Sequence, residues 1–253
     1  MDYRTMHKTH QRFIVPKIFQ DLPNLVAGIS TRHGGVSQGA YNSLNLGKHT
    51  TDYTDHIEQN LFLLCQDLGI QTSQLARAYQ CHGAEIWHTE IGGYQENFDA
   101  IIATQPGVIA GVGIADCCPI LIVDPNQKIT VAIHAGWKGT VAQIVKKTTI
   151  ELIEKYESKA KDLLAYIGPC ISQTHFEVGD EVAEHFSDSE KTKLGPKFHV
   201  DLKKANLHQL QEAGIDQIEI SEYCTFEHNE HFFSHRKENG ITGRMMAFAG
   251  FRK

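Results

Sequence analysis

The sequence predicts an α+β fold, a single domain over residues 1–253 in which mixed β-sheets are flanked by helices. Segments with strand character outnumber segments with helical character. Most of these strand segments follow one another at hairpin-like spacing, whereas a doubly wound fold would alternate them with helices. No linker, internal repeat or low-complexity tract divides the chain, and one large domain can reach 253 residues.

Eight segments carry the apolar character of strands. They are Leu75–Tyr79, Ala84–His88, Ala100–Ala103, Val108–Ile114, Pro119–Val123, Ile129–Ile133, Ala165–Ile167 and Ile218–Ile220. Before them, residues 30–47 are polar and rich in turn-forming glycines, with no helical or strand period. A loop of this length is more often functional than a simple connection, so we expect it to contribute to a site.

The first predicted helix follows this loop. Its apolar residues at positions 57, 61, 64, 65 and 68 share one face, and Gly69 suits the position just past the helix end. Asp55 and Glu58 form a candidate capping pair at its start. Cys65 lies on the apolar face, so we expect its thiol in the core.

Two further helices are predicted later in the chain. One has an apolar stripe over Val141–Ile153, and Thr140 with Gln143 has the spacing of a capping box at its start. The other is short, over Asn206–Ala213, and is closed by Gly214.

The charge balance excludes several classes of partner. Lysine and arginine number 24 and aspartate and glutamate 30, which gives a net charge of −6 and favours neither nucleic acid nor an anionic membrane. The first 20 residues contain no apolar run of the kind found in signal peptides or membrane spans. We therefore expect a cytoplasmic protein whose six cysteines are free thiols or metal ligands. Nothing in the sequence specifies an oligomeric state.

Two adjacent cysteines stand in GIADCCPILIVD, residues 113–124. If this run is a strand, Cys117 and Cys118 point to opposite faces, and only one of them can serve a given site. The same parity would turn Asp116 away from Cys117. Likewise, Cys81 should face away from its neighbour His82 where the backbone is extended.

His82, Cys117 and His134 come from the ends of three different predicted strand segments. Two imidazoles and a thiolate form a set that zinc accepts, with a fourth position left for water. Their spacing matches no local zinc-finger pattern, so taken alone it also fits ordinary buried side chains. A second reading is a nucleophilic cysteine, with Cys117 activated by His134.

Several basic residues are candidates for binding an anion. Arg32 lies in the polar loop, and Arg236 and Arg244 lie near Gly-rich turns, where a guanidinium suits a phosphate or carboxylate. A solvated surface position is the competing interpretation, most of all for Arg236. Lys138 precedes a predicted helix start, but the spacing is not that of a nucleotide P-loop.

Seven motifs occur in order between residues 30 and 244: TRHGGVSQGAYNSLNLG, QCHGAEI, ADCCPILIVD, AIHAGWKGT, YIGPCIS, CTF with FFSHR, and GITGR. Together they resemble the bacterial YfiH-like family, also called the multicopper polyphenol oxidase or laccase-domain family. The resemblance spans almost the whole chain. It implies a single-domain mixed fold and a mononuclear zinc site, with copper as the other metal to consider.

Carried over residue by residue, the resemblance makes His82, Cys117 and His134 the metal ligands and the catalytic centre. Cys118 and Cys81 then fall at variable positions beside two of the ligands. Arg32, Asn45 and Arg244 become the expected residues for binding substrate or phosphate. His235 departs from the pattern, because an aromatic residue is expected there.

The resemblance also implies purine nucleoside chemistry. The expected activity is phosphorolysis of adenosine, inosine, guanosine and methylthioadenosine to base and ribose 1-phosphate, with adenosine deamination in the same site. The alternatives are a copper-dependent polyphenol oxidase and a cysteine or metal hydrolase that edits peptidoglycan precursors. Laccase chemistry requires several coppers and more histidines than one His₂Cys set provides, so nucleoside chemistry ranks first.

Overall fold

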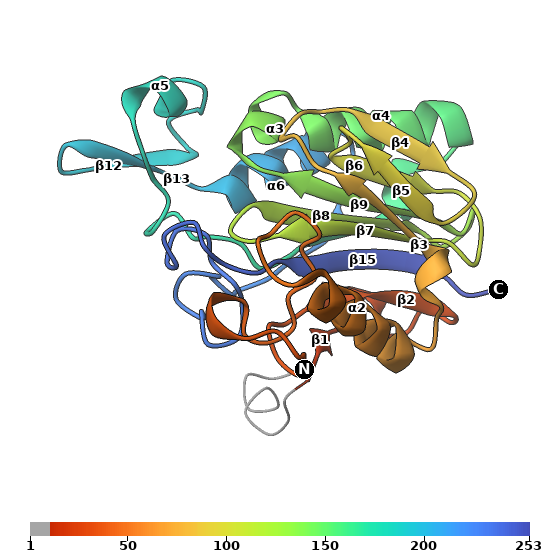
Figure 1. Cartoon of the computed structure of the whole chain (residues 1–253). Coiled ribbons are helices and arrows are strands. Elements are labelled where there is room, and N and C mark those ends of the chain that lie inside the picture. Colours follow the sequence, from red (N-terminus) through yellow and green to blue (C-terminus); the bar gives the residue numbers. More distant parts are fainter. Residues whose placement is uncertain (1–10) are drawn as a thin grey trace.

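Two six-stranded β-sheets lie face to face, and helices cover the outer face of each, in a computed structural model that describes residues 11–253 (Figure 1). The layers follow one another as helix, sheet, sheet and helices. This arrangement confirms the predicted α+β class with mixed sheets. No helix within residues 11–253 combines the length and the apolar character needed to cross a bilayer.

The first sheet has the order β1-β2-β15-β7-β3-β5. Its strands are β1 (Phe13–Ile14), β2 (Leu25–Ser30), β3 (Leu75–Tyr79), β5 (Gly93–Glu96), β7 (Ile109–Ile114) and β15 (Met245–Phe251). The C-terminal strand β15 lies between β2 and β7 and runs antiparallel to both. Strand β3 is parallel to both of its neighbours, β7 and β5.

The second sheet has the order β14-β10-β8-β9-β6-β4. Its strands are β4 (Ile86–Thr89), β6 (Ala100–Ala103), β8 (Cys118–Asp124), β9 (Ile129–Ala135), β10 (Leu164–Ile167) and β14 (Gln217–Ile220). Strands β8 and β9 form an antiparallel hairpin in which Cys118 pairs with Ala135 and Pro119 with His134. This register places the start of β8 beside the end of β9.

The central strands are buried on both faces, which explains their unbroken apolar sequences. Along β8, Leu121 and Val123 enter the core between the two sheets. Ile120 and Ile122 enter a second core, which the second sheet forms with its helices. Alternation therefore divides one strand between two apolar layers.

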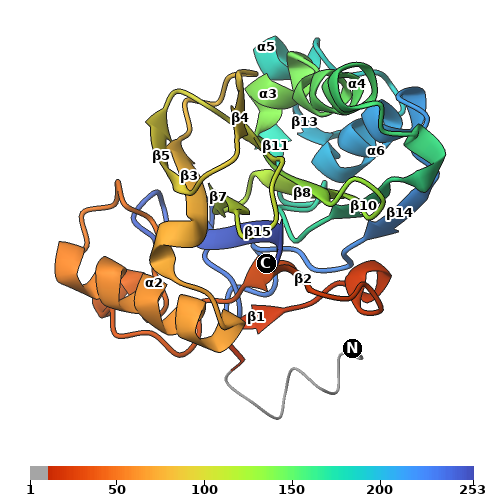
Figure 2. The same ribbon diagram turned by 90° about the vertical axis from the view of Figure 1, so that its right-hand side faces the viewer.

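Helix α2 (Thr54–Leu68) covers the first sheet, while α3 (Trp137–Val141), α4 (Ile144–Tyr156) and α6 (Leu202–Glu212) cover the second (Figure 2). A small sheet of β11 (Glu177–Val178), β13 (Lys197–Val200) and β12 (Lys191–Leu194) projects from one end with α5 (Asp180–Ala183) (Figure 1). Short 3₁₀ turns occur at η1 (Lys17–Phe19), η2 (Gly39–Tyr41), η3 (Thr72–Gln74) and η4 (Ala160–Asp162).

The predicted helix ends are confirmed in part. Gly69 adopts a left-handed φ of 63° at the end of α2, as expected. The capping pair at the start of α2 is wrong, because its N-cap residue is Tyr53 and no side chain caps the helix. Residues 202–205 extend α6 beyond the predicted start, since the Asp201 side chain accepts a hydrogen bond from the Lys204 N–H.

The predicted capping box at Thr140 is also wrong. The chain is already helical from Trp137, and a break at Gln143, with a φ of 60°, separates α3 from α4. Asn206 Nδ2 donates a hydrogen bond of 3.1 Å to the Thr140 hydroxyl, so this side chain joins α3 to α6.

Candidate metal centre

The chain crosses from the first sheet to the second three times at the same end of the molecule. Residues 80–85 connect β3 to β4, residues 97–99 connect β5 to β6, and residues 115–117 connect β7 to β8. His82 lies in the first crossing segment and Cys117 in the third, while His134 lies near the end of β9. The topology of the two sheets therefore brings together three residues that are distant in sequence.

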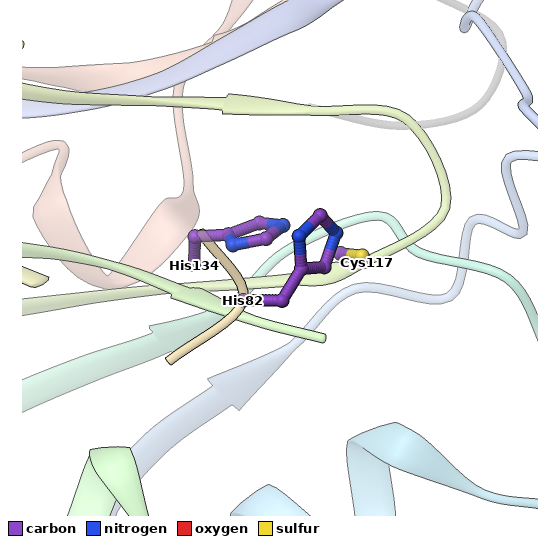
Figure 3. A group of neighbouring side chains, drawn as sticks. All are labelled: His82, Cys117 and His134. Carbon is purple, nitrogen blue, oxygen red and sulfur yellow. The ribbon is translucent and has the colours of Figure 1, made fainter. Parts of the chain in front are cut away.

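The side chains of His82, Cys117 and His134 converge on one point (Figure 3). One ligand atom from each residue lies within 4.8 Å of the corresponding atoms of the other two. The two imidazole rings meet edge to face, with centroids 4.8 Å apart. The structure thus brings together all three residues that the sequence singled out.

The backbone is shaped to present these side chains. His82 and Asp116 adopt left-handed conformations, with φ of 61° and 81°, in the crossing segments 80–85 and 115–117. Gly136 passes so close that a Cβ atom there would lie 3.0 Å from Cys117 Sγ and 3.1 Å from His82 Cδ2. A side chain at position 136 would therefore push against two of the three candidate ligands.

Asp99 is a buried carboxylate beside the three candidate ligands, and no sequence motif singled it out. Its Oδ1 accepts hydrogen bonds from Nδ1 of His134 at 2.8 Å and from the His82 N–H at 3.0 Å. Its Oδ2 accepts from the Gly83 N–H at 2.7 Å and the Cys81 N–H at 3.2 Å. One side chain therefore orients one candidate ligand ring, that of His134, and fixes the loop that carries another, His82.

The protonation states suit a metal. Burial raises the pKa of Cys117, but the charge and hydrogen bond of His134, and then those of His82, outweigh it and lower the pKa to about 6. Burial lowers the pKa of His134, yet Cys117 and Asp99 raise it to about 9. A thiolate is the form of cysteine that binds metal, and it predominates here at neutral pH.

The donor set fits a single zinc ion. Three protein ligands of nitrogen and sulfur, one of them backed by a carboxylate, are typical of a zinc site with one open position. Within residues 11–253, this is the one group of at least three such side chains close enough to share an ion. A multinuclear copper centre needs further histidines, and no other histidine of residues 11–253 belongs to this close group of ligand atoms.

Cys118 and Cys81 have other surroundings. Cys118 is fully buried in the core between the second sheet and its helices, where burial raises its pKa and its thiol contacts that of Cys170. Cys81 is exposed, and its Sγ lies 3.4 Å from Asp99 Oδ2. The two adjacent cysteines do diverge, but Cys117 ends a turn and Cys118 begins the strand, so strand alternation is not the cause.

The three side chains line a cavity of about 430 Å³, a volume within the range of small-molecule sites. Arg244 lines the same cavity. Its Nη1 donates hydrogen bonds of 2.9 Å to the carbonyls of Thr242 and Gly243, and burial lowers its pKa. No hydrogen bond within residues 11–253 engages its Nε or Nη2, so these donors remain for an anion.

The sequence profile of the family described as multi-copper polyphenol oxidoreductase laccase matches residues 26–252. The chain belongs to this family. Among its relatives, a purine nucleoside phosphorylase from Deinococcus radiodurans is 36% identical over 237 residues, which cover 90% of each chain. The purine nucleoside phosphorylase YfiH of Escherichia coli is 34% identical over 244 residues, covering 94% of this chain and 98% of that protein.

Solved structures agree with this membership. The crystal structure of YlmD from Geobacillus stearothermophilus is similar with a TM-score of 0.90 and 29% identity, over 96% of this chain and 100% of that one. A Bacillus licheniformis protein titled hypothetical protein YfiH is similar with a TM-score of 0.91 and 27% identity, over 97% and 98% of the two chains.

In this member of the laccase family, Arg32 does not line the cavity. Its guanidinium forms an ion pair of 3.1 Å with Glu238 and donates hydrogen bonds to the carbonyls of Asn42 and Asn229. It also lies over the Phe233 ring, 4.5 Å from the centroid. These contacts give Arg32 a structural role between the polar loop and the C-terminal turns.

Asn45 acts on the cavity indirectly. It is fully buried, and its Oδ1 accepts hydrogen bonds from the N–H groups of Arg244 and Gly47, both at 2.9 Å. It therefore positions Arg244 without lining the cavity itself. Of the three residues predicted to bind substrate, Arg244 alone lines the cavity.

Asp116 and His235 both line the cavity. Both carboxylate oxygens of Asp116 are engaged within the chain. Its Oδ1 accepts a hydrogen bond from the Thr225 hydroxyl at 2.6 Å, and its Oδ2 accepts one from the Arg236 N–H at 2.6 Å. The expectation that strand parity turns Asp116 away is wrong, since the residue occupies a left-handed turn. His235 replaces the expected aromatic residue on the cavity wall.

Proposed function

We propose that this protein is a zinc-dependent purine nucleoside phosphorylase, with His82, Cys117 and His134 as metal ligands. Its substrates are adenosine, inosine, guanosine and methylthioadenosine, each converted with phosphate to the free base and ribose 1-phosphate. The observation that carries the proposal is that the three proposed ligands line one cavity with Arg244, whose guanidinium uses Nη1 alone in hydrogen bonds among the described residues. The names of the relatives support the same reaction class.

Phosphorolysis requires an anion to be held beside the sugar. An oxygen of hydrogen phosphate forms a bond to C1′ of the ribose, the bond from C1′ to N9 of the purine breaks, and the base leaves with the proton that the phosphate gives up. Positive charge develops on the sugar meanwhile, so a fixed phosphate dianion stabilises the transition state. We assign Arg244 to hold the phosphate, since its Nη1 is anchored by two carbonyls and its other donors are free.

The same cavity suits adenosine deamination, in which water replaces the amino group at C6 and ammonia leaves. A zinc ion held by the three ligands would supply a water of lowered pKa at this point. Asp99 fixes the His134 ring through Nδ1, which leaves Nε2 as the nitrogen for metal. The hydrogen bonds of Asp99 to the His82 and Gly83 N–H groups hold a second ligand in place.

A cysteine hydrolase is the second candidate, because the pKa of Cys117 is about 6 and His134 lies beside it. A thiolate next to an imidazolium is the arrangement of a nucleophilic cysteine. His82 and Asp99 favour the metal interpretation, since a Cys–His nucleophile needs neither a second imidazole nor a loop fixed around it. The two candidates respond in opposite ways to a chelator.

The test is to incubate metal-loaded protein with inosine and phosphate and to measure hypoxanthine and ribose 1-phosphate. We expect both products, their loss after chelation, and their return when zinc is added. Absence of products from the metal-replete protein would overturn the proposal. Turnover that survives chelation and is accompanied by acylation of Cys117 would favour the hydrolase, and oxygen consumption with a phenol after copper loading would favour the oxidase. We further propose that the protein acts in the cytoplasm on these small molecules.

A further inference from the structure

The cavity is strongly cationic although the chain as a whole is acidic. Lys48, Arg77, Arg236 and Arg244 line it, and Asp116 is the one carboxylate among the described residues that does. Across residues 11–253, none of these four cations forms a salt bridge, whereas the whole chain has a net charge of −6. This concentration of unpaired positive charge favours a ligand with more than one anionic group.

Arg77 differs from the other two arginines of the cavity. Arg236 and Arg244 each donate hydrogen bonds to main-chain carbonyls. No hydrogen bond or ion pair engages the Arg77 guanidinium within residues 11–253, and burial lowers its pKa. Arg77 is half-buried, and an unpaired cation partly withdrawn from water costs free energy that an anionic ligand would offset.

Arg77 is fixed on the scaffold and belongs to no flexible loop. It lies in β3, paired with Gly111 of β7 on one side and Tyr94 of β5 on the other. Gly111 also lines the cavity, and a Cβ there would lie 3.6 Å from Arg77 Cγ and 2.9 Å from Met246 Sδ. The glycine at position 111 therefore leaves room for the aliphatic part of the Arg77 side chain.

A second cation stands beside Arg77 on the same wall. Lys48 Nζ lies 3.9 Å from the centroid of the Tyr94 ring, and His49 Nε2 lies 2.5 Å from the Tyr94 hydroxyl. These contacts bind the segment of Lys48 and His49 to β5, directly next to the position of Arg77. Arg77 and Lys48 therefore form a second cationic wall, built by elements other than those that present Arg244.

We propose that Arg77, with Lys48, binds the phosphate of a purine nucleoside 5′-monophosphate, so that the cavity accepts nucleotides as well as nucleosides. This inference rests on the proposed function, which places the nucleoside at the metal ligands and inorganic phosphate at Arg244. An ester phosphate on the ribose is the anion that a bound nucleoside can extend to another wall of the same cavity. A planar guanidinium suits such a dianion because two of its N–H donors can bind two oxygens at once.

The test compares inosine with inosine 5′-monophosphate by calorimetry on zinc-loaded protein in phosphate-free buffer. Neither deamination nor phosphorolysis of inosine can then occur. We expect the nucleotide to bind about tenfold or more tightly, with an advantage that shrinks as salt increases. In Arg77→Met the ratio of the two dissociation constants should approach one. Arg77→Lys should retain part of the nucleotide's advantage in affinity. Lys159→Met, an exposed control, should leave that advantage unchanged.

Equal affinity of the wild-type protein for the two ligands would overturn the inference, as would an undiminished advantage in Arg77→Met. If Arg77→Met does not fold, Lys48→Met decides by the same ratio. A third titration uses inorganic phosphate. If Arg77→Met weakens phosphate binding while the wild type shows no nucleotide advantage, Arg77 binds free phosphate and the nucleotide assignment is wrong. An inosine phosphorolysis assay on the same samples shows separately whether the proposed function itself fails.

Discussion

The carboxylate of Asp99 and the imidazole of His134 form a buried pair, with Oδ1 2.8 Å from Nδ1 and side-chain exposures of 0% and 5%. The hydrogen bond selects which ring nitrogen faces the other two ligands. Burial raises the pKa of Asp99, but the hydrogen bond and charge of His134 outweigh it and lower the pKa, so the residue remains a carboxylate. It is the positioning residue of this centre.

Replacing Asp99 with asparagine should weaken metal binding about 10–100-fold, because the amide accepts through one oxygen where the carboxylate accepts through two. Competition with a chromophoric chelator measures the affinity. Asp216→Asn, at an exposed position, is the matched control and should bind metal as the wild type does. Unchanged affinity in the Asp99 variant, with an unchanged fold, would contradict the positioning role.

The two adjacent cysteines provide a second test. Cys117→Ala should remove both metal and activity, because one of three protein ligands is lost. Cys118→Ala should leave both largely intact and lower the free energy of unfolding by about 1 kcal/mol or somewhat more, since it trims a core thiol. Metal analysis and chemical denaturation distinguish these outcomes. If Cys118→Ala alone emptied the site, the assignment of Cys117 would be wrong.

Substitutions of Arg244 and Arg32 should have different effects, the first on phosphate binding and the second on the stability of the fold. Arg244→Met is expected to raise the KM for phosphate about tenfold or more, since it removes the charge-assisted donors that face the cavity. Arg32→Met should leave that KM unchanged and lower the free energy of unfolding by about 1–3 kcal/mol, because Oε1 of Glu238 then loses its partner. A rise in the phosphate KM in Arg32→Met would place this residue in the site after all.

The thiol of Cys117 should titrate far below an ordinary cysteine in protein freed of metal. With a pKa of about 6, its thiolate forms as pH rises through that value and is largely complete at neutrality. The ultraviolet thiolate absorbance of the wild type minus that of Cys117→Ala reports it directly. His134→Ala should shift the midpoint upward, because burial is then opposed by His82 alone. A midpoint near that of a free thiol in the wild type would refute the assignment.

The sequence allowed the fold class and the three converging side chains to be predicted, but not the whole scaffold. Strand β15 was missed because MMAFAGF has no alternation, which reflects its burial on both faces. Asp99 left one signal, a carboxylate directly before the buried strand β6, and its partners become visible only in three dimensions. The single-domain organisation over residues 1–253 stays a prediction.

Arg32 and Arg77 show why charge alone is ambiguous in a sequence. Arg32 stands in a turn-rich loop, where guanidinium groups often bind ligands, yet its own chain supplies Glu238 and two carbonyls as partners. Arg77 lies inside a predicted strand and was not among the residues predicted to bind an anion. It nevertheless lines the cavity, with no hydrogen bond or ion pair to its guanidinium among the described residues. The difference depends on which residues lie across space, and local pattern does not encode this.

The crossing segments that carry His82 and Cys117 give the proposed metal a mechanical consequence. Each of these segments joins one sheet to the other, and His134 lies near the end of a strand of the second sheet. An ion bound to His82, Cys117 and His134 would therefore cross-link the two sheets at this end of the molecule. A cross-link that forms in the folded state alone adds its binding free energy to folding. Amide hydrogens at the adjoining ends of β3, β7 and β9 should then exchange more slowly with metal bound, and this end of the molecule should open first when the metal is withdrawn.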